Sequence, residues 1–126
     1  MDCPFCDTAT LTTVWESPLS LAFRDRYPVS PGHTLIIPRR HVASWFDATR
    51  EEQQDLMDAV NLLERQLDAQ LSPPPDGYNV GINAGEAAGQ TVMHLHVHLI
   101  PRYHGDVEDP RGGVRYVIPA KGNYLR

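Results

Sequence analysis

Three histidines that alternate with apolar residues, His94, His96 and His98, are the residues of this chain best placed to do chemistry. Alternation with a period of two is typical of a strand, so the three imidazoles are predicted to share one face. A metal site would suit them, because histidine is the commonest metal ligand. Catalysis by neutral imidazole, as nucleophile or as acid and base, would also suit them. A sheet face that is rich in histidine without function is the third interpretation, and the strict alternation disfavours it.

A second set of potential ligands, Cys3 and Cys6, lies near the N-terminus in the sequence Cys-Pro-Phe-Cys. A thioredoxin-type redox pair would follow a strand in a βαβ unit, and no strand is predicted before these cysteines. Two cysteines cannot form a zinc site that needs four thiolates, although a tetrahedral site of two cysteines and two histidines remains open. The alternative is a pair of small packed residues that bind no metal.

A glycine-rich segment, residues 84–89, lies just before the histidines. It matches neither a Walker loop nor a dinucleotide-binding fingerprint, because its glycine spacing differs and the lysine is missing. Glycines nevertheless allow backbone N–H groups to come close to a phosphate. The segment is therefore interpreted either as a phosphate-binding loop beside the histidines or as a plain hairpin turn.

The stretch from Ala88 to Arg102 resembles the motif of the histidine-triad (HIT) family. Residues 94–100 follow the family pattern His-φ-His-φ-His-φ-φ, in which φ is an apolar residue. The flanking residues resemble the branch of dinucleoside polyphosphate hydrolases, and the similarity extends over residues 3–104. The third histidine, His98, stands where sister transferases carry glutamine, which also favours a hydrolase.

The resemblance implies a reaction at the α-phosphate of a nucleotide. In this mechanism His96 attacks phosphorus and forms a covalent nucleotidyl-histidine, which water then cleaves. His98 would hydrogen-bond the transferred phosphate or the leaving oxygen. Gln90, Thr91 and nearby backbone N–H groups would hold the phosphate oxygens, where charge spreads in the transition state. The implied catalytic set is His94, His96, His98 and Gln90.

The same resemblance implies a nucleotide pocket. Phe5, Phe23 and Leu35 would form an apolar slot for the base, which predicts a purine preference without strong base discrimination. Asp25 and Asn83 would position the ribose. A further histidine is expected behind the active site, where it supports the triad strand by hydrogen bonding. The predicted nucleotide-binding residues are Phe5, Phe23, Asp25, His33, Leu35, Asn83, Gln90 and Thr91.

A structural zinc ion, no organic cofactor and a homodimer are further implications of the resemblance. The implied ligands are Cys3, Cys6, His41 and His94, and four protein ligands leave no open position for water. Dinucleoside polyphosphates of the diadenosine type are the favoured substrates, while nucleoside phosphoramidates and aminoacyl-adenylates offer the same α-phosphate. A zinc-stabilised nucleotide-binding protein with little turnover is the alternative from another functional class.

Several elements must position these residues. Short strands are predicted at 11–16, 19–25, 33–38 and 78–83, where apolar residues alternate or cluster between turn residues. A capping box of Thr49 and Glu52 begins one long helix, which ends at the prolines 73–75. Its apolar stripe is Leu56, Val60, Leu63, Leu67 and Leu71. A last short strand is predicted at 114–118, within a tail of loop composition.

This order of elements predicts one α+β domain over residues 1–126, with the tail 105–126 less distinctive. We expect a HIT-like antiparallel sheet of about five strands, one long helix and a short N-terminal helical segment. The net charge of −5 argues against a nucleic-acid partner. No apolar run could span a membrane and no signal peptide is visible, so a cytoplasmic location is expected.

Overall fold

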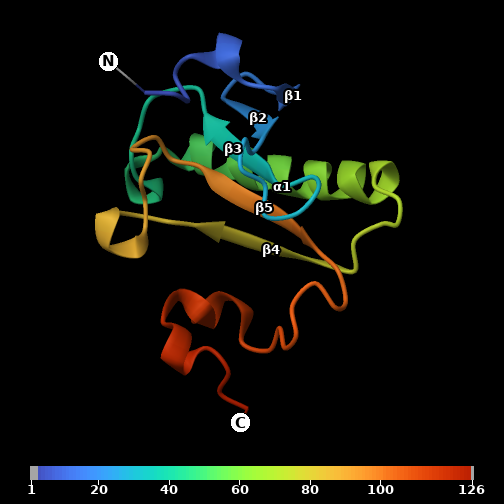
Figure 1. Cartoon of the computed structure of the whole chain (residues 1–126). Coiled ribbons are helices and arrows are strands. Elements are labelled where there is room, and N and C mark those ends of the chain that lie inside the picture. The colour runs from blue at the N-terminus through green and yellow to red at the C-terminus, as the bar shows by residue number, and fades with distance from the viewer. Residues whose placement is uncertain (1–2, 126) are drawn as a thin grey trace.

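The computed structural model describes residues 3–125; Met1, Asp2 and Arg126, which the predicted domain includes, lie outside the described residues. Five antiparallel strands form one sheet in the order β1-β2-β3-β5-β4 (Figure 1). One long helix, α1, and a short turn of 3₁₀-helix at Thr8–Thr10 accompany it, so the predicted α+β class is confirmed. The strands are Thr13–Glu16 (β1), Ser20–Arg24 (β2), Thr34–Pro38 (β3), Gly77–Ile82 (β4) and Val97–Arg102 (β5).

The long helix α1 spans Arg50–Gln70 and covers one face of the sheet. Its predicted capping box is present, because Thr49 and Glu52 each accept the other's backbone N–H through a side-chain oxygen. Arg40 also donates two hydrogen bonds to Glu52, and these lower the pKa of the buried Glu52 carboxyl to about 2. The ion pair thus fixes the start of α1 against the end of β3.

The two faces of the sheet carry separate apolar clusters. Under α1, the stripe of the helix meets Ala22, Ile36 and the apolar residues of the histidine stretch, Leu95, Val97 and Leu99. On the opposite face, a smaller cluster has no helix over it and is partly covered by the N-terminal segment through Phe5 and Leu11. The residues of this second cluster are Leu21, Phe23, Leu35 and Ile37.

The histidine stretch is only partly a strand, which corrects the prediction. β5 begins at Val97, while His94 lies in a bend and Leu95 and His96 precede the strand outside the ladder. The reason is local: the Leu95 N–H donates to the Val42 carbonyl in the segment after β3, 2.7 Å away. The predicted alternation of faces survives without the ladder, because Leu95, Val97 and Leu99 are all buried in the core beneath α1.

The tail also differs from its prediction. Residues 114–118 form no strand but lie in a 3₁₀-helix, Gly113–Val117, followed by a second one at Pro119–Lys121. Gly112 and Gly113 turn the chain with positive φ angles of 100° and 47°, and Pro119 cannot donate to a ladder. Figure 1 shows this tail set off from the sheet beyond the edge strand β4. Across residues 3–125, no helix has the length and apolarity to cross a membrane.

Candidate active site

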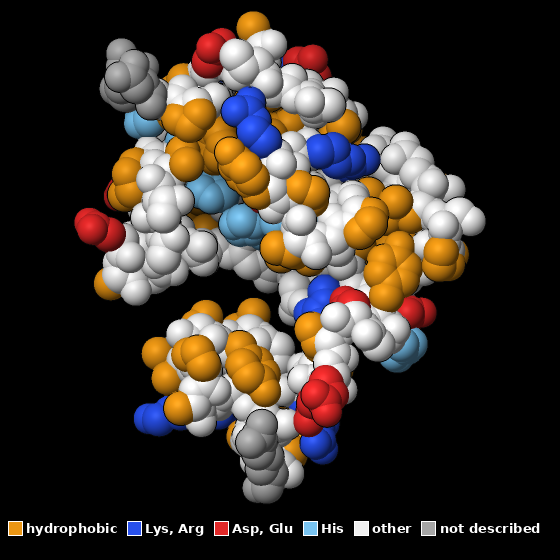
Figure 2. Space-filling view, in the orientation of Figure 1, with side chains coloured by type: hydrophobic (Ala, Val, Ile, Leu, Met, Phe, Trp, Pro, Cys, Tyr) orange, Lys and Arg blue, Asp and Glu red, His pale blue; other side chains and the backbone are white. Residues whose placement is uncertain are grey.

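A cleft of about 530 Å3 opens on the sheet face that α1 does not cover. The antiparallel register aligns Phe23 of β2, Leu35 of β3 and His98 of β5 in one row across this face. Gly81 of β4 is the next member of the row, and its missing side chain leaves the space beside His98 open. Figure 2 shows histidine side chains reaching the surface in this hollow between apolar side chains.

Phe5 connects the apolar part of the cleft to the histidines. Its ring lies edge-on to Phe23 and to His96, with both pairs of ring centroids 5.1 Å apart. The cleft therefore has an apolar end, formed by Phe5, Phe23 and Leu35, and a polar end at His96 and His98. An aromatic base followed by a phosphate would fit this order of surfaces.

The hydrogen bonds of His96 determine which of its nitrogens is free. Its Nδ1 lies 2.8 Å from the His94 carbonyl oxygen, which can only accept, so Nδ1 carries the hydrogen. The lone pair of the neutral ring is then on Nε2. His96 lines the cleft, and this tautomer leaves it a nitrogen able to act as a nucleophile.

His98 has the opposite tautomer, because its partner His33 is itself fixed by the backbone. The Val29 N–H donates to His33 Nδ1 over 3.2 Å, so His33 carries its hydrogen on Nε2. That nitrogen lies 2.9 Å from His98 Nδ1 and donates to it, which leaves the His98 hydrogen on Nε2. Burial, and then the neighbouring His96 and His33, lower the pKa of His98 to about 4. His98 is therefore a neutral hydrogen-bond donor at neutral pH.

Asp25 lies beside this chain of histidines at the end of β2. One carboxylate oxygen accepts the Tyr27 N–H over 2.9 Å, and the other is 3.4 Å from His33 Nε2. The 2.9 Å contact between His33 and His98 is shorter, so His98 is the main acceptor of the His33 hydrogen. Burial lowers the pKa of His33, while the Asp25 charge opposes that shift.

Four potential zinc ligands gather at the other side of His96. Cys3 Sγ is 3.4 Å from His94 Nδ1, and Cys6 Sγ is 3.5 Å from His94 Nδ1 and 3.2 Å from His41 Nδ1. A tetrahedral zinc with Zn–S of about 2.3 Å and Zn–N of about 2.0–2.1 Å would separate sulfur from nitrogen by about 3.6 Å. His94 Nε2 lies 2.8 Å from the Pro38 carbonyl and donates to it, so the Nδ1 lone pair faces the cysteines. These four residues therefore fit a zinc ion.

The structure gives Gln90 a different place from the predicted one. Its side chain is buried away from the cleft, accepts the Gly85 N–H and donates to the carbonyls of Ala43 and Val92. The backbone N–H groups of residues 88–90 are likewise bonded inside the glycine-rich loop. Gln90 thus holds this loop in shape, and Thr91 and Val92, which do line the cleft, are better placed to meet a phosphate.

Most of the predicted catalytic and nucleotide-binding residues come together, and three of them do not line the cleft. Gln90, His33 and His94 are buried behind it, as loop support, as partner of His98 and as member of the cysteine cluster. The cleft also contains residues that the sequence did not single out, including Thr12, Arg26 and Tyr27. No periodicity marks Arg26, which follows the end of β2. The predicted residues that line the cleft are Phe5, Phe23, Asp25, Leu35, Asn83, Thr91, His96 and His98.

Comparison with known proteins finds one family. The HIT domain model matches residues 8–105. The chain is 39% identical over 95 residues to the bis(5'-nucleosyl)-tetraphosphatase (asymmetrical) of Schizosaccharomyces pombe, covering 75% of this chain and about half, 51%, of that protein. It is 35% identical over 106 residues to the adenosine 5'-monophosphoramidase hnt1 of the same yeast, covering 81% and 75%. A crystal structure of a HIT family protein from Bacillus anthracis superposes with a TM-score of 0.77 at 38% identity, covering 83% and 76%.

Proposed function

This chain belongs to the HIT domain family, and from that premise we propose that it is an enzyme that cleaves nucleotides at the α-phosphate through a covalent intermediate on His96. The observation that carries the proposal is the pair of opposite tautomers at the polar end of the cleft. His96 presents a lone pair on Nε2, and His98 presents a hydrogen on Nε2. One attacking nitrogen beside one donating nitrogen is what a displacement at phosphorus requires.

In the first step, the Nε2 lone pair of His96 forms a bond to the α-phosphorus while the bond from phosphorus to the leaving group breaks. The leaving atom departs with the electron pair of the broken bond and accepts a hydrogen bond from His98 Nε2, while His98 Nδ1 keeps its hydrogen bond from His33. A leaving group that needs a proton takes it from solvent. In the second step, water attacks phosphorus and releases a proton to solvent, the electron pair of the P–N bond returns to His96 Nε2, and a nucleoside monophosphate leaves. Both steps use only the imidazoles and water.

Groups around the two histidines would position the nucleotide. The Thr91 hydroxyl and the backbone N–H groups of Thr91 and Val92 have no hydrogen-bond partner within residues 3–125, and both residues line the cleft. They are our candidates for holding the phosphate oxygens. Asp25 and Asn83 also line the cleft, and we propose that they hydrogen-bond the ribose.

Dinucleoside polyphosphates are the substrates that we favour, because the tetraphosphatase of S. pombe is 39% identical over the matched region. Nucleoside phosphoramidates are the second candidate, supported by the similarity to the phosphoramidase hnt1. Both classes present an α-phosphate with a leaving atom that could accept a hydrogen bond from His98. A turnover screen of the two classes, with identification of the released mononucleotide, separates them.

His96→Ala tests the nucleophile. We expect kcat to fall by at least about 10⁴-fold while nucleotide binding persists, because the variant loses the attacking atom and keeps the cleft. His104→Ala is the matched control, since His104 is exposed and does not line the cleft. Mass spectrometry of reactions quenched without acid should find the nucleotidyl group on the peptide that contains His96. A nucleotide-binding protein without turnover would show no difference between His96→Ala and the unchanged chain.

We further propose that the cysteine cluster holds a structural zinc. The ion would bind Cys3, Cys6, His41 and His94 and would tie the N-terminal segment, with Phe5, to the histidine stretch. Four protein ligands would leave no position for a substrate or a reactive water. Zinc would therefore stabilise the wall of the cleft and the backbone that carries His96, without entering the reaction.

We also propose a homodimer, and the tail supports it. Figure 2 shows apolar side chains gathered on the part of the tail that lies across a gap from the sheet. Exposed apolar groups of this density are unusual on a monomer. We expect sedimentation to report a dimer, and Val117→Asp with Ile118→Asp to shift it to monomer. The exposed residues of the tail are Val114, Tyr116, Val117, Ile118, Tyr124 and Leu125.

A further inference from the structure

An unpaired cation lies at the apolar end of the cleft. Arg26 directly follows Asp25, lines the cleft and is exposed. Within residues 3–125 its guanidinium makes no hydrogen bond or ion pair. The other arginine at the cleft, Arg24, is half-buried and donates to Thr34 and Gln70. Arg26 is therefore the one of the two whose donors are free for a ligand.

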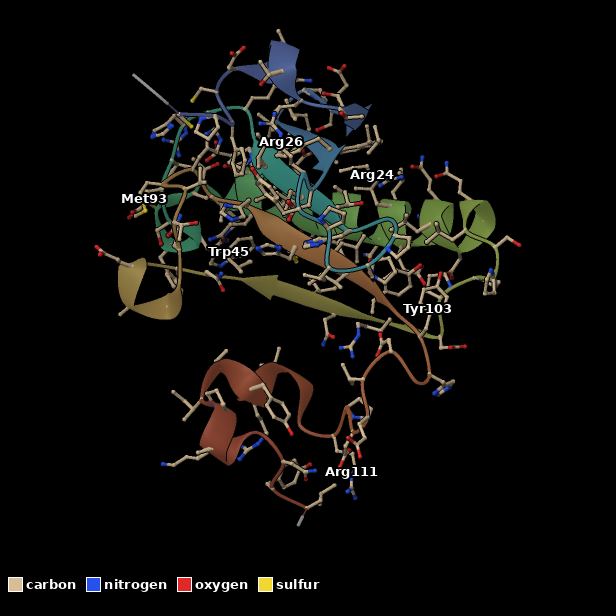
Figure 3. All side chains as sticks on the ribbon, in the orientation of Figure 1. Arg24, Arg26, Trp45, Met93, Tyr103 and Arg111 are labelled. Atoms are coloured by element: carbon tan, nitrogen blue, oxygen red, sulfur yellow. The ribbon has the colours of Figure 1, made fainter. Side chains whose placement is uncertain are left out.

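The position of Arg26 separates it from the phosphate end. Along the cleft, His96 contacts Phe5, and Phe5 contacts Phe23, two residues before Asp25. Figure 3 labels Arg26 above the histidine-bearing strand, near the N-terminal segment. In Figure 2, which has the same orientation, a cationic side chain lies there, and apolar side chains separate it from the histidines. A nucleotide with its α-phosphate at His96 would thus direct its base, and not its phosphates, toward Arg26.

We propose that Arg26 reads the edge of the base and makes the cleft prefer guanine; this rests on the proposed nucleotide function. A guanidinium has five N–H donors and no acceptor. The edge of guanine with O6 and N7 offers two acceptors, which match a pair of parallel donors. The same edge of adenine offers N7 and the N6 amino group, so one donor of Arg26 would face another donor. The apolar residues alone would supply no such discrimination, so Arg26 replaces the expected weak base preference with a specific one.

The test is the binding of GMP and AMP to the full chain, measured by calorimetry, which needs no turnover. We expect GMP to bind about tenfold more tightly than AMP. Arg26→Gln should bring the two affinities within about twofold of each other by weakening GMP. Arg50→Gln, at an exposed arginine that does not line the cleft, makes the same change in net charge and should keep the tenfold ratio.

Arg26→Lys distinguishes base reading from attraction of phosphate. Lysine keeps the charge but lacks the paired donors, so the preference for GMP should largely disappear. If Arg26→Lys keeps full affinity and Arg26→Gln weakens GMP and AMP alike, Arg26 binds phosphate and the inference is overturned. Equal affinities of the unchanged chain for GMP and AMP overturn it too, while leaving the proposed reaction intact. Failure of both nucleotides to bind would overturn the inference together with the proposed function.

Discussion

Two clusters of side chains lie on either side of His96, the proposed nucleophile, and by distance alone both could hold a metal ion. One is Cys3, Cys6, His41 and His94, and the other is Asp25, His33 and His98. In each cluster the potential ligand atoms lie within 4.8 Å of one another. The difference between them lies in the second nitrogen of a buried imidazole, because a histidine that binds a metal through one nitrogen carries its hydrogen on the other.

The cysteine cluster satisfies this requirement. His94 places its hydrogen on Nε2, where the Pro38 carbonyl accepts it, and turns its Nδ1 lone pair toward the sulfurs. A carbonyl is a common partner for the distal nitrogen of a metal-bound histidine. The hydrogen bond to Pro38 thus already orients His94 so that its Nδ1 could bind a cation.

The Asp25 cluster fails the same requirement. His33 Nδ1 receives the Val29 N–H, and a metal on Nε2 would put a hydrogen on Nδ1, so two donors would face each other. The arrangement is instead a directed series of hydrogen bonds from Val29 through His33 to His98. Proximity of ligand atoms alone therefore does not distinguish the two clusters, whereas the direction of the supporting hydrogen bonds favours the cysteine cluster as the proposed metal site.

The largest expected effect comes from removing the two thiols, which should change the metal content and the stability of the protein. Cys3→Ser with Cys6→Ser should remove a zinc present at about one per chain and lower the free energy of unfolding by about 4 kcal/mol, a fall in Tm of about 10–15 °C. Metal analysis of protein purified without chelator, followed by thermal unfolding, measures both. The Cys3→Ser/Cys6→Ser variant keeps the series of hydrogen bonds from Val29 through His33 to His98, which we call the histidine relay.

His33→Gln is the control for this comparison, because it changes the other cluster. We expect it to retain the full zinc content, since His33 is not a ligand in the proposed site. Zinc lost equally from both variants would show that the two clusters share the metal. A chain that contains no zinc and is unharmed by the double substitution would leave the cysteines with a packing role only.

The second-largest expected effect is on catalysis, and it tests the histidine relay separately from the cysteine cluster. His33→Phe should lower kcat by about 10²–10³-fold, because His98 loses the partner that keeps its hydrogen on Nε2. His33→Gln should recover part of the rate, since its amide N–H can still donate to His98 Nδ1. A rate unchanged in His33→Phe, with a substrate whose leaving atom accepts a hydrogen bond from His98, would show that the tautomer of His98 does not depend on His33.

The elements were more predictable from sequence than the orientation of the site residues. The start of α1 follows from a local capping box, Thr49 with Glu52, and the buried strand β3 follows from its apolar run. The role of Gln90 does not, because its three partners are backbone groups of Gly85, Ala43 and Val92 that only the folded loops bring together. The cysteine cluster was expected from resemblance, as its ligands lie up to 91 residues apart.

The smallest expected effect is a dependence of stability on pH to which the burial of His98 should contribute. Burial, and then His96 and His33, lower the pKa of His98 to about 4, while an unfolded histidine has a pKa of about 6.5. Unfolding therefore takes up a proton between these values, so stability from this group is complete above about pH 6.5 and is lost as pH falls toward 4. The loss should amount to about 1–2 kcal/mol, measured by urea unfolding at a series of pH values.

Acid would also release the proposed zinc ion, because thiolates and imidazoles must be deprotonated to bind it, so the measurement is made in the Cys3→Ser/Cys6→Ser background. In this background the histidine relay is intact, and no zinc is expected. Adding His98→Gln should flatten the decline between about pH 6.5 and 4.5, since glutamine takes up no proton. An equal decline with and without His98 would mean that its burial has no energetic consequence.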